Sequence, residues 1–437
     1  MVSASSRELR GGAVARTSLL AVALATLTAA ACTASGPRSQ RSAHAASPQS
    51  RGEIRALEEG EQGFAIVVGK VLTADEHDQV FEPGLVVVRD RSIDYVGPLV
   101  EVPSGYERLD APELFAAPGM IDLHSHVQSG GWGDLNDMVI SLNPEFRSSP
   151  TLVPGNESVR RACAGGVTTL FGIPGSGTNN GGFGVLYKTR CESTYDGCVL
   201  ADPGGMKVAQ AYNPERGADL GATRAGMAWN LARANEIALA ANRDGRDDFA
   251  LRNLQKVHSK ELPLLIHTAG PACHTTIDMW GERYPVRAVL SHGCFNGWRF
   301  SPYAAQVGMP MNLGPRTFDW FSSREGQVIG TPQRYEQAGA ALISVNTDAP
   351  VMPQEELALQ GAMGARLGAS SYLMLKACTY NPAKSFGIED KVGSLSPGRH
   401  ADIVLWRGDP LDPRARVERV WIEGRLEYDR ARDGQRF

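Results

Sequence analysis

The sequence predicts an α/β protein: a (β/α)8 barrel of the TIM type, with a small β-sandwich domain formed by both chain ends. Three observations predict this fold. Short β-rich runs occur near both ends of the chain, apolar strands alternate with helical segments over roughly 280 residues between them, and polar side chains follow several of these strands. A doubly wound open sheet is the competing fold, but no Gly-x-Gly-x-x-Gly motif joins a strand to a helix.

Short β-rich runs without intervening helical segments occur near both ends of the chain and not in its middle. This pattern favours one composite domain built from the two ends. Pro83 and Gly84 supply a turn between the first two runs. The runs cover residues 64–72, 85–96, 401–406 and 417–426. We therefore expect a β-sandwich from 59–117 and 395–437, around a barrel from 118–394.

Within the barrel region, short apolar runs predict buried strands and one segment has a helical period. Met227, Leu231, Ala234 and Ala238 recur at spacings of 4, 3 and 4, which predicts a helix with one apolar face. Strand candidates are residues 167–171, 262–266, 288–290 and 341–345.

The N-terminus reads as an export signal. Residues 1–31 carry Arg7, Arg10 and Arg16 before an apolar run too short to span a bilayer comfortably. The small residues before Cys32 resemble a bacterial lipobox, so we expect Cys32 to be lipidated and the protein to be a membrane-anchored lipoprotein of the cell envelope, on the periplasmic side. Cleavage after Ala31 or Ala45, giving a soluble secreted or periplasmic protein, and an uncleaved membrane anchor are the alternatives. Residues 32–58 should form a flexible tether.

Composition excludes several classes of partner. The 44 Lys and Arg residues are balanced by 48 Asp and Glu residues, so there is no basic excess for a nucleic-acid partner. Only the N-terminal apolar run approaches membrane length, so membrane contact is expected through a lipid anchor alone. Export permits disulfides, and Cys191 with Cys198 is the expected pair, with two free thiols as the alternative.

Four histidines and one aspartate each end or follow a strand-like run. They are His124, His126, His267, His292 and Asp348. In a barrel the carboxyl ends of all strands open onto one face, so these groups would converge there. The period of two in a strand points both imidazoles of His124 and His126 to one side. Imidazole and carboxylate suit Zn²⁺, which predicts a metal site.

These motifs resemble the metal-dependent amidohydrolase superfamily, over residues 64 to about 426. The resembling segments are 117–126, 166–169, His267, His292, Thr347–Asp348, 379–384 and 392–405. The segments 204–209, 213–214, 174–177 and 181–184 look like the imidazolonepropionase-related and prolidase-like branch. The resemblance implies a (β/α)8 barrel, a β-sandwich and hydrolysis of a carbon–nitrogen bond by metal-activated water.

The resemblance also implies a ligand set. We expect one divalent ion on His124, His126 and Asp348 and a second on His267 and His292. In two-metal relatives a lysine at the position of Lys207 is carboxylated and bridges both ions, and Asp348 would be the catalytic proton carrier. A strand-end lysine that binds a substrate carboxylate in a one-metal site is the alternative. Two zinc ions are expected, with Mn, Fe or Co as alternatives, and no other cofactor.

The predicted function is hydrolysis of the amide bond of a small molecule or short peptide, with a dipeptide favoured over a cyclic amide. A deaminase would need a Glu at the end of the fifth strand, where Thr268 follows His267. A surface binding protein without catalysis is the remaining alternative, and a homo-oligomer stays open. The remaining histidines, His44, His77, His258, His274 and His400, are expected to lie outside the catalytic group.

Overall fold

The computed structural model describes residues 51–437, except 53, 131, 132, 134, 138, 139, 217–221 and 320–325. The described residues belong to one compact unit, residues 48–437. The predicted signal peptide, Cys32 and most of the predicted tether lie outside the described residues. Among the described helices, none combines the length and apolarity needed to cross a bilayer.

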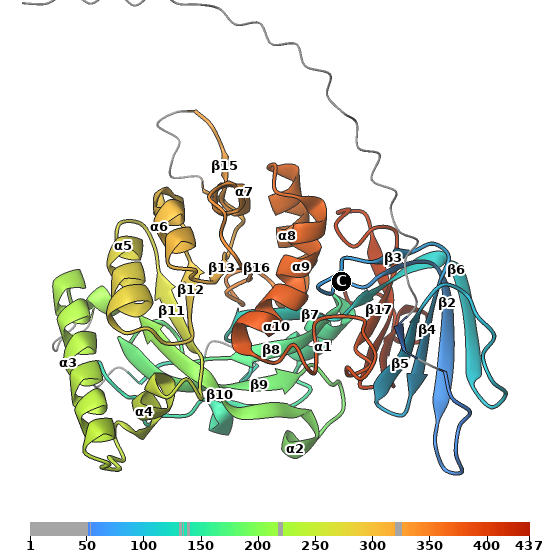
Figure 1. The fold of residues 1–437 in the computed structure, drawn as a ribbon, viewed down its shortest axis with the longest axis horizontal. Coiled ribbons are helices and arrows are strands. Elements are labelled where there is room, and N and C mark those ends of the chain that lie inside the picture. The colour runs from blue at the N-terminus through green and yellow to red at the C-terminus, as the bar shows by residue number, and fades with distance from the viewer. Residues whose placement is uncertain are drawn as a thin grey trace, which may run out of the picture. The chain divides into compact units, whose positions relative to one another are not determined.

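The barrel is an eight-stranded, nearly closed sheet (Figure 1). An isolated parallel bridge between Ser125 and Ala349 joins the first strand to the chain beyond the last. The strands, in the order β7-β8-β9-β10-β11-β12-β13-β16, are β7 (Met120–Ser125), β8 (Val167–Gly172), β9 (Asn180–Lys188), β10 (Val199–Ala209), β11 (Leu264–Thr268), β12 (Ala288–His292), β13 (Met311–Leu313) and β16 (Ile343–Val345). The predicted α/β barrel is confirmed.

Strand β9 departs from the ideal barrel because it runs antiparallel to both of its neighbours. It is rich in glycine, and a Cβ on Gly184 would lie 2.5 Å from the carbonyl oxygen of Gly172 on β8. The hairpin places the β8–β9 loop, which contains Ser176, at the carboxyl end of β8. The chain that follows β9, which contains Cys191, therefore lies at the opposite end of the barrel.

Helices surround the barrel strands, and the predicted helical period is confirmed. Helix α3 (Arg224–Arg243) buries Met227, Leu231, Ala234 and Ala238. The other helices of the barrel are α1 (Glu157–Ala164), α2 (Tyr195–Cys198), α4 (Arg252–His258), α5 (Ala272–Ile277), α6 (Ser301–Gln306), α7 (Thr331–Gln337), α8 (Leu357–Arg366), α9 (Ser371–Cys378) and α10 (Tyr380–Phe386). A short hairpin joins β14 (Phe318–Asp319) to β15 (Ile329–Gly330).

Both chain ends build a second sheet, as predicted, and it is a single hydrogen-bonded sheet of nine strands. The junction of the two ends is the pairing of β6 with β17, which sets Phe115 opposite Trp406. The strands are β1 (Arg51–Gly52), β2 (Gly63–Leu72), β3 (Val80–Phe81), β4 (Gly84–Arg89), β5 (Ser92–Gly97), β6 (Glu107–Pro118), β17 (Ile403–Arg407), β18 (Arg416–Ile422) and β19 (Arg425–Asp429), followed by α11 (Arg430–Asp433). Strand β1 lies inside the range predicted as a tether and pairs with β5.

Two of the predicted β runs are in fact hairpins. The run 85–96 turns at Asp90, with φ of 52°, and the run 417–426 turns at Glu423 and Gly424, with φ of 50° and 74°. Left-handed residues are typical of the two-residue turns that match the twist of adjacent strands. Neither Asp90 nor Glu423 is a glycine, so the sequence pattern alone did not mark these turns.

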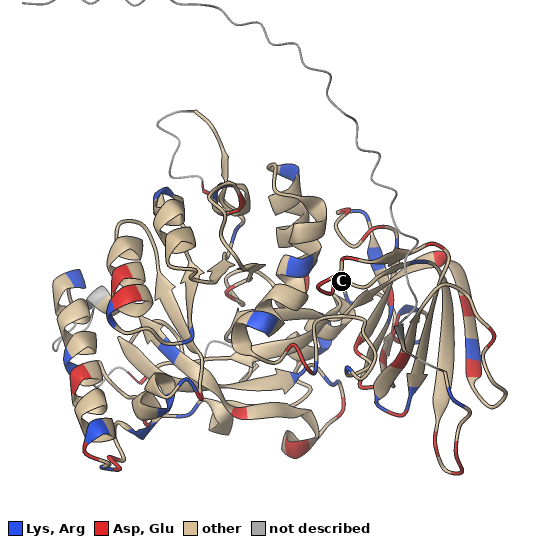
Figure 2. Ribbon diagram, in the orientation of Figure 1, with Lys and Arg blue, Asp and Glu red and all other residues tan. Residues whose placement is uncertain are grey.

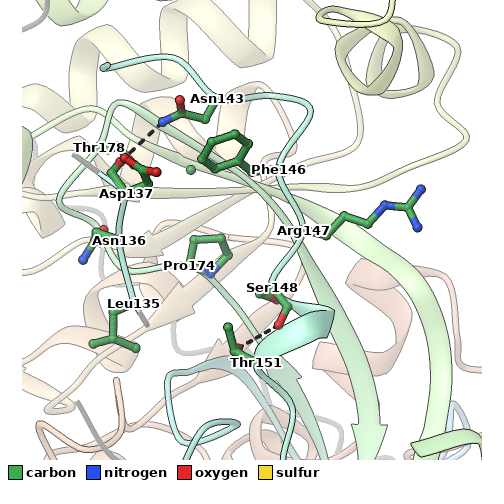
Figure 3. Close-up of a pocket in the computed structure, with 11 residues that line it drawn as sticks. Leu135, Asn136, Asp137, Asn143, Phe146, Arg147, Ser148, Thr151, Pro174 and Thr178 are labelled. Atoms are coloured by element: carbon green, nitrogen blue, oxygen red, sulfur yellow. Dashed lines mark hydrogen bonds between the residues drawn. The ribbon is translucent and has the colours of Figure 1, made fainter. Parts of the chain in front are cut away.

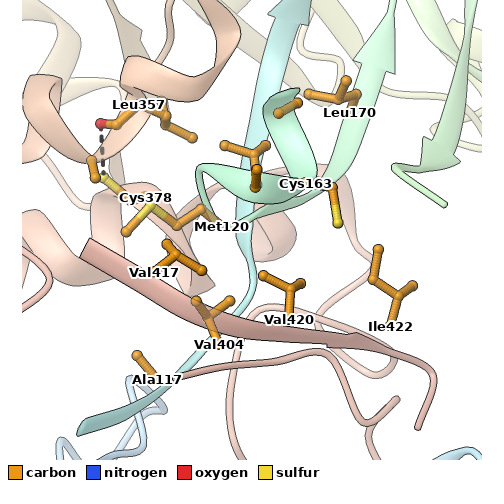
Figure 4. Close-up of a cluster of buried hydrophobic side chains, with 14 of the residues drawn as sticks. Ala117, Met120, Cys163, Leu170, Leu357, Cys378, Val404, Val417, Val420 and Ile422 are labelled. Atoms are coloured by element: carbon orange, nitrogen blue, oxygen red, sulfur yellow. Dashed lines mark hydrogen bonds between the residues drawn. The ribbon is translucent and has the colours of Figure 1, made fainter. Parts of the chain in front are cut away.

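An apolar cluster joins barrel and nine-stranded sheet. Met120 and Leu170 of the barrel share it with Val404, Val417 and Val420 of the sheet (Figure 4). Figure 2 shows Lys and Arg interspersed with Asp and Glu along the helices and the nine-stranded sheet. Strand β7 follows directly on β6, so this packed interface fixes the position of β7 relative to the nine-stranded sheet.

Candidate active site

The structure brings the six predicted site residues together at the carboxyl ends of the barrel strands. His124 lies on β7 and His126 directly after it, Lys207 on β10, His267 on β11, His292 at the end of β12 and Asp348 after β16. Strands β10, β11 and β12 are neighbours in the sheet. The imidazole centroids of His124 and His292 are 4.4 Å apart, and those of His267 and His292 are 4.5 Å apart.

One group of three ligands centres on Asp348. Its Oδ1 lies 3.2 Å from Nε2 of His124 and 3.3 Å from Nε2 of His126. Nδ1 of His126 lies 3.0 Å from the carbonyl oxygen of Ile173, which can only accept a hydrogen bond. In the neutral ring Nδ1 therefore carries the proton, which leaves the lone pair of Nε2 available to a cation bound between the ring and the carboxylate. Lone pairs converge on one point, which is the donor set a cation requires.

A second group contains His267 and His292. His292 donates from Nδ1 to the carbonyl oxygen of Gly314 at 3.1 Å, and its Nε2 has no hydrogen-bond partner. Neither ring nitrogen of the buried His267 has one either. Unpartnered buried nitrogens are costly unless a ligand meets them. Among the described residues, the ligand atoms of His124, His267 and His292 lie within 4.8 Å of one another, as do those of His124, His126 and Asp348.

Burial sets the protonation of these ligands. It lowers the pKa of His292 to about 4 and the pKa of His124 and His267 well below the usual value. Burial acts to raise the pKa of Asp348, but the neighbouring imidazoles outweigh it and hold that pKa well below its usual range. The group therefore offers neutral imidazoles and an ionised carboxylate at neutral pH, which are the forms that bind a divalent metal ion.

Lys207 lies beneath this cluster and is 1% exposed. Its Nζ donates to Oγ of Ser176 at 3.0 Å and lies 3.4 Å from Nε2 of His124. Burial lowers the pKa of Lys207 to about 7. A substantial fraction of the amine is then neutral at physiological pH, and the neutral amine is the form that reacts with CO2.

Two of the predicted ligands have strained backbones. His292 has a φ of 77° and Asp348 a φ of 50°. Such values are uncommon for residues with a Cβ, and they persist where the surrounding structure enforces them. His292 ends β12 and Asp348 follows β16, so both left-handed residues lie at the carboxyl ends of barrel strands.

Three contacts around the ligands were not predicted from the sequence. The hydroxyl of Ser291 lies 2.7 Å from Nδ1 of His124, Ser176 contacts Lys207, and Asp122 accepts hydrogen bonds from the backbone of His124 and Thr347. The signal for two of them was present, since Ser291 directly precedes His292 and Asp122 precedes His124 by two residues. Groups that orient a ligand histidine through its second nitrogen tune metal affinity.

Two cavities are lined by residues that neighbour the site residues in the chain or in the sheet, and neither lining includes one of the six site residues. One, of about 370 Å³, is lined by the loop before α1 and the β8–β9 loop, including Asn136, Phe146, Pro174 and Thr178 (Figure 3). Pro174 and Thr178 flank Ser176, the partner of Lys207. The second, of about 490 Å³, has Gln210, Arg224, Pro271 and Thr275 among its lining residues. The backbone N–H of Gln210 donates to the carbonyl oxygen of His267, so one lining residue of this cavity is a strand neighbour of His267.

In the structure Cys191 and Cys198 are free thiols, which is the alternative to the predicted Cys191–Cys198 disulfide. Cys198 is buried and directs its thiol to the carbonyl oxygen of Tyr195 at 3.3 Å. Cys191 instead contacts the thiol of Cys163. Closeness in the sequence did not bring the first pair together, because α2 turns Cys198 away.

The histidines expected to lie outside the site do so where the structure describes them. His258 pairs with Oδ1 of Asn235 at 2.7 Å, His400 with Glu423 at 3.2 Å and His77 with Glu76 at 3.6 Å. His274 is exposed on α5 and its ring lies 5.3 Å from that of Tyr303. His44 lies outside the described residues.

Comparisons with known proteins agree with this geometry. The amidohydrolase family model matches residues 333–426. The chain is 27% identical over 401 residues to the amidohydrolase tasK of Hapsidospora irregularis, an alignment covering 80% of this chain and 40% of that protein. It is 23% identical over 348 residues to the adenine deaminase of Moorella thermoacetica, covering 76% and 50%. The chain thus spans half or less of the length of these two relatives.

Solved structures share the fold over most of the chain. The amidohydrolase from Thermotoga maritima MSB8 matches with a TM-score of 0.75 and 29% identity, covering 84% of this chain and all of that one. A Xaa-Pro dipeptidase with bound methionine matches with a TM-score of 0.54 and 14% identity over the same shares, a likeness of fold alone. Together with the histidine and aspartate groups at the barrel mouth, these matches show that the chain is similar to amidohydrolases in sequence and in fold.

Proposed function

We propose that this protein is a metal-dependent amidohydrolase that hydrolyses a carbon–nitrogen amide bond of a small substrate. One observation carries the proposal: four imidazoles and Asp348 converge at the barrel mouth, with nitrogens of His267 and His292 that have no hydrogen-bond partner among the residues that the structure describes. Such a costly set of buried, unpartnered nitrogens is explained if a metal ion meets them.

Each residue has a proposed role. His124, His126 and Asp348 would hold one divalent ion, and His267 and His292 a second, with a carboxylated Lys207 between them. When bound, these ions would polarise the scissile carbonyl and lower the pKa of water. Asp348 is ionised and would accept a proton from the attacking water and deliver it to the departing nitrogen. Ser291 and the carbonyl oxygens of Ile173 and Gly314 would keep three imidazoles in the ligating orientation.

The substrate class that we propose is a short peptide with a free carboxylate. The cavity of about 490 Å³ that Gln210 lines is large enough for a dipeptide, and Arg224 in its lining carries a positive charge. An arginine fork suits a carboxylate. Within the superfamily we propose to place this protein in the prolidase-like branch. Its fold is similar to that of a Xaa-Pro dipeptidase.

A deaminase is the second candidate, because an adenine deaminase is among the matching relatives. The residue after His267 is Thr268, which is buried and hydrogen bonded to Thr276 at 3.0 Å. A hydroxyl held by another threonine is a poor general acid for a departing amine. Peptide hydrolysis is therefore the better-supported reading, and a cyclic-amide substrate is the remaining variant.

The proposed location is the cell envelope, with a lipid on Cys32 after removal of residues 1–31. Cys32→Ala should release the protein from membrane fractions if the lipid anchors it. Unchanged membrane association of that variant would contradict the anchor, and an unprocessed N-terminus in the wild-type protein would contradict export.

The test of the activity is a substrate panel with the metal-loaded protein. Dipeptides, lactams and aminopurines should be incubated with Zn²⁺ or Mn²⁺ protein, before and after chelation, with amino acid and ammonia release measured separately. We expect dipeptide cleavage that chelation abolishes and metal restores. Ammonia release from an aminopurine alone would favour the deaminase, and metal binding without any turnover would favour the binding protein. His274→Ala is the matched control, because this exposed histidine lies outside the metal groups.

A further inference from the structure

Two thiols meet where the barrel packs on the nine-stranded sheet. Cys163 lies on α1, and Cys191 follows β9 at the end of the barrel opposite the active site. Both are free thiols, Cys191 packs against the apolar cluster that contains Cys163, and each thiol is the main influence on the pKa of the other. Nothing in the proposed hydrolysis uses either residue.

The two thiols differ in exposure. Cys163 is 0% exposed and lies among apolar side chains of the cluster that contains Leu170 and Val420 (Figure 4). Cys191 packs against the edge of this cluster and lines a cavity of about 200 Å³. A reagent in the cavity can therefore reach Cys191, whereas Cys163 is reached only through Cys191.

The backbone of Cys191 is held on both sides. Its N–H donates to the carboxylate of Glu427 at 3.1 Å. Its carbonyl oxygen would lie 2.3 Å from a Cβ on Gly155, so the chain leading into α1 runs directly against it. These contacts keep Cys191 next to Cys163 rather than next to Cys198.

We propose that Cys163 and Cys191 form a disulfide bond when the protein meets a small-molecule disulfide, tying α1 to the chain after β9. The bond would close the loop that contains β8 and β9. It replaces the Cys191–Cys198 pairing expected from the sequence.

The exchange proceeds in two balanced steps. The thiolate of Cys191 attacks one sulfur of the small disulfide, whose S–S bond breaks to leave a mixed disulfide on Cys191 and one thiolate. Cys163 then loses its proton and attacks the Cys191 sulfur, and the second small thiolate leaves. One small disulfide is reduced to two thiols, and two cysteine thiols are oxidised to one protein disulfide.

The surroundings assign the first attack to Cys191. The hydrogen bond from the Cys163 thiol lowers the pKa of Cys191, and Arg160 and Arg436 act in the same direction. The same hydrogen bond and burial raise the pKa of Cys163. The cavity is lined by four arginines, Arg160, Arg425, Arg432 and Arg436, against three acids. A disulfide that carries carboxylates, such as oxidised glutathione, suits this lining.

The test is a non-reducing peptide map of the folded full chain. The protein is reduced, exposed to oxidised glutathione, acid-quenched, unfolded and alkylated before digestion. We expect one peptide pair joined through Cys163 and Cys191, with Cys198 and Cys378 alkylated. Free Cys163 after exposure, or a Cys191–Cys198 link, would overturn the proposal.

Variants separate the two steps. Cys163→Ser should stop at one glutathione attached to Cys191, while Cys191→Ser should leave Cys163 unmodified. Cys198→Ser is the matched control and should form the Cys163–Cys191 bond as the wild-type chain does. Glutathione attached to Cys163 in the Cys191→Ser protein would contradict the assigned order. The wild-type map carries the test if a variant fails to fold, and neither result depends on hydrolytic activity.

Discussion

The carboxylate of Asp122 accepts two hydrogen bonds from Thr347, from its backbone N–H at 2.9 Å and from its hydroxyl at 2.7 Å. The other carboxylate oxygen accepts from the backbone N–H of His124 at 2.9 Å. Asp122 thereby joins the strand that carries His124 to the segment that carries Asp348. Burial of this carboxyl raises its pKa to about 6 despite the hydrogen bonds.

Loss of this link should weaken metal binding. Asp122→Asn replaces one carboxylate oxygen with an NH2 group, which would face the N–H or O–H groups that now donate to Asp122. The positions of His124 and Asp348 relative to each other would then no longer be fixed. We expect metal affinity to fall by about 10- to 100-fold, measured by competition with a chelating dye. Thr347→Ser keeps both donors and should bind metal as the wild type does. Equal affinity for wild type and Asp122→Asn would refute the role of Asp122.

Removing the carboxylate of Asp348 should separate metal binding from catalysis. Asp348→Asn keeps an oxygen ligand but cannot accept the proton, so we expect a loss of at least about 10²-fold in kcat with the metal content retained. Metal content is measured by inductively coupled plasma mass spectrometry on the same sample as the rate. Full activity of this variant would exclude Asp348 as the proton carrier.

The role of Lys207 can be read from metal stoichiometry. Lys207→Gln cannot form a carbamate and should retain fewer metal ions per chain than the wild type. In the wild-type protein, loading with ¹³C-labelled bicarbonate and metal should give a carbamate signal by NMR that Lys207→Gln lacks. An undiminished metal content in the variant, without a carbamate signal in the wild type, would favour the one-metal alternative.

The metal-free protein should lose stability as the pH falls. The folded pKa of His292 is about 4 and its unfolded pKa is near 6.5, so the unfolded state binds more protons between these values. The stabilisation is complete above pH 6.5 and is lost towards pH 4, at about 3 kcal/mol for this residue. Urea unfolding in chelator at several pH values measures it. His292→Asn should make the free energy of unfolding depend less on pH. An unchanged slope of this free energy against pH would contradict the role of His292 in the pH dependence.

The proposed carboxylate contact predicts a change in KM rather than in kcat. Arg224→Gln should raise KM for a free dipeptide by about 10-fold, because a charge-assisted pair is lost. The corresponding dipeptide amide, which lacks the carboxylate, should be affected little. Equal effects on both substrates would remove Arg224 from substrate binding.

The sequence was most informative where residue order alone determines position. Each of His124, His267, His292 and Asp348 follows a strand, and barrel strands end on one face, so their convergence could be predicted. The direction of β9 could not be predicted, because an apolar, glycine-rich run has the same pattern in either direction. Its reversal brings Ser176 to Lys207 and carries Cys191 to the opposite end of the barrel.

The contacts that orient the ligands were also beyond the sequence. Asp122 and Thr347 are far apart in the chain, and nothing in their local pattern indicates that they meet. The same reason applies to the predicted Cys191–Cys198 disulfide. It was inferred from the short separation of the two residues in the sequence, which does not determine how far apart they lie in the folded protein. The turns at Asp90 and Glu423 were missed because each adopts a left-handed conformation without being glycine.

Anomalous diffraction from a crystal of the zinc-loaded protein, recorded on both sides of the zinc absorption edge, tests the metal site most directly. The structure predicts one peak between His124, His126 and Asp348 and a second beside His267 and His292. Zinc peaks at other positions, with these side chains unliganded in an active crystal, would contradict the account.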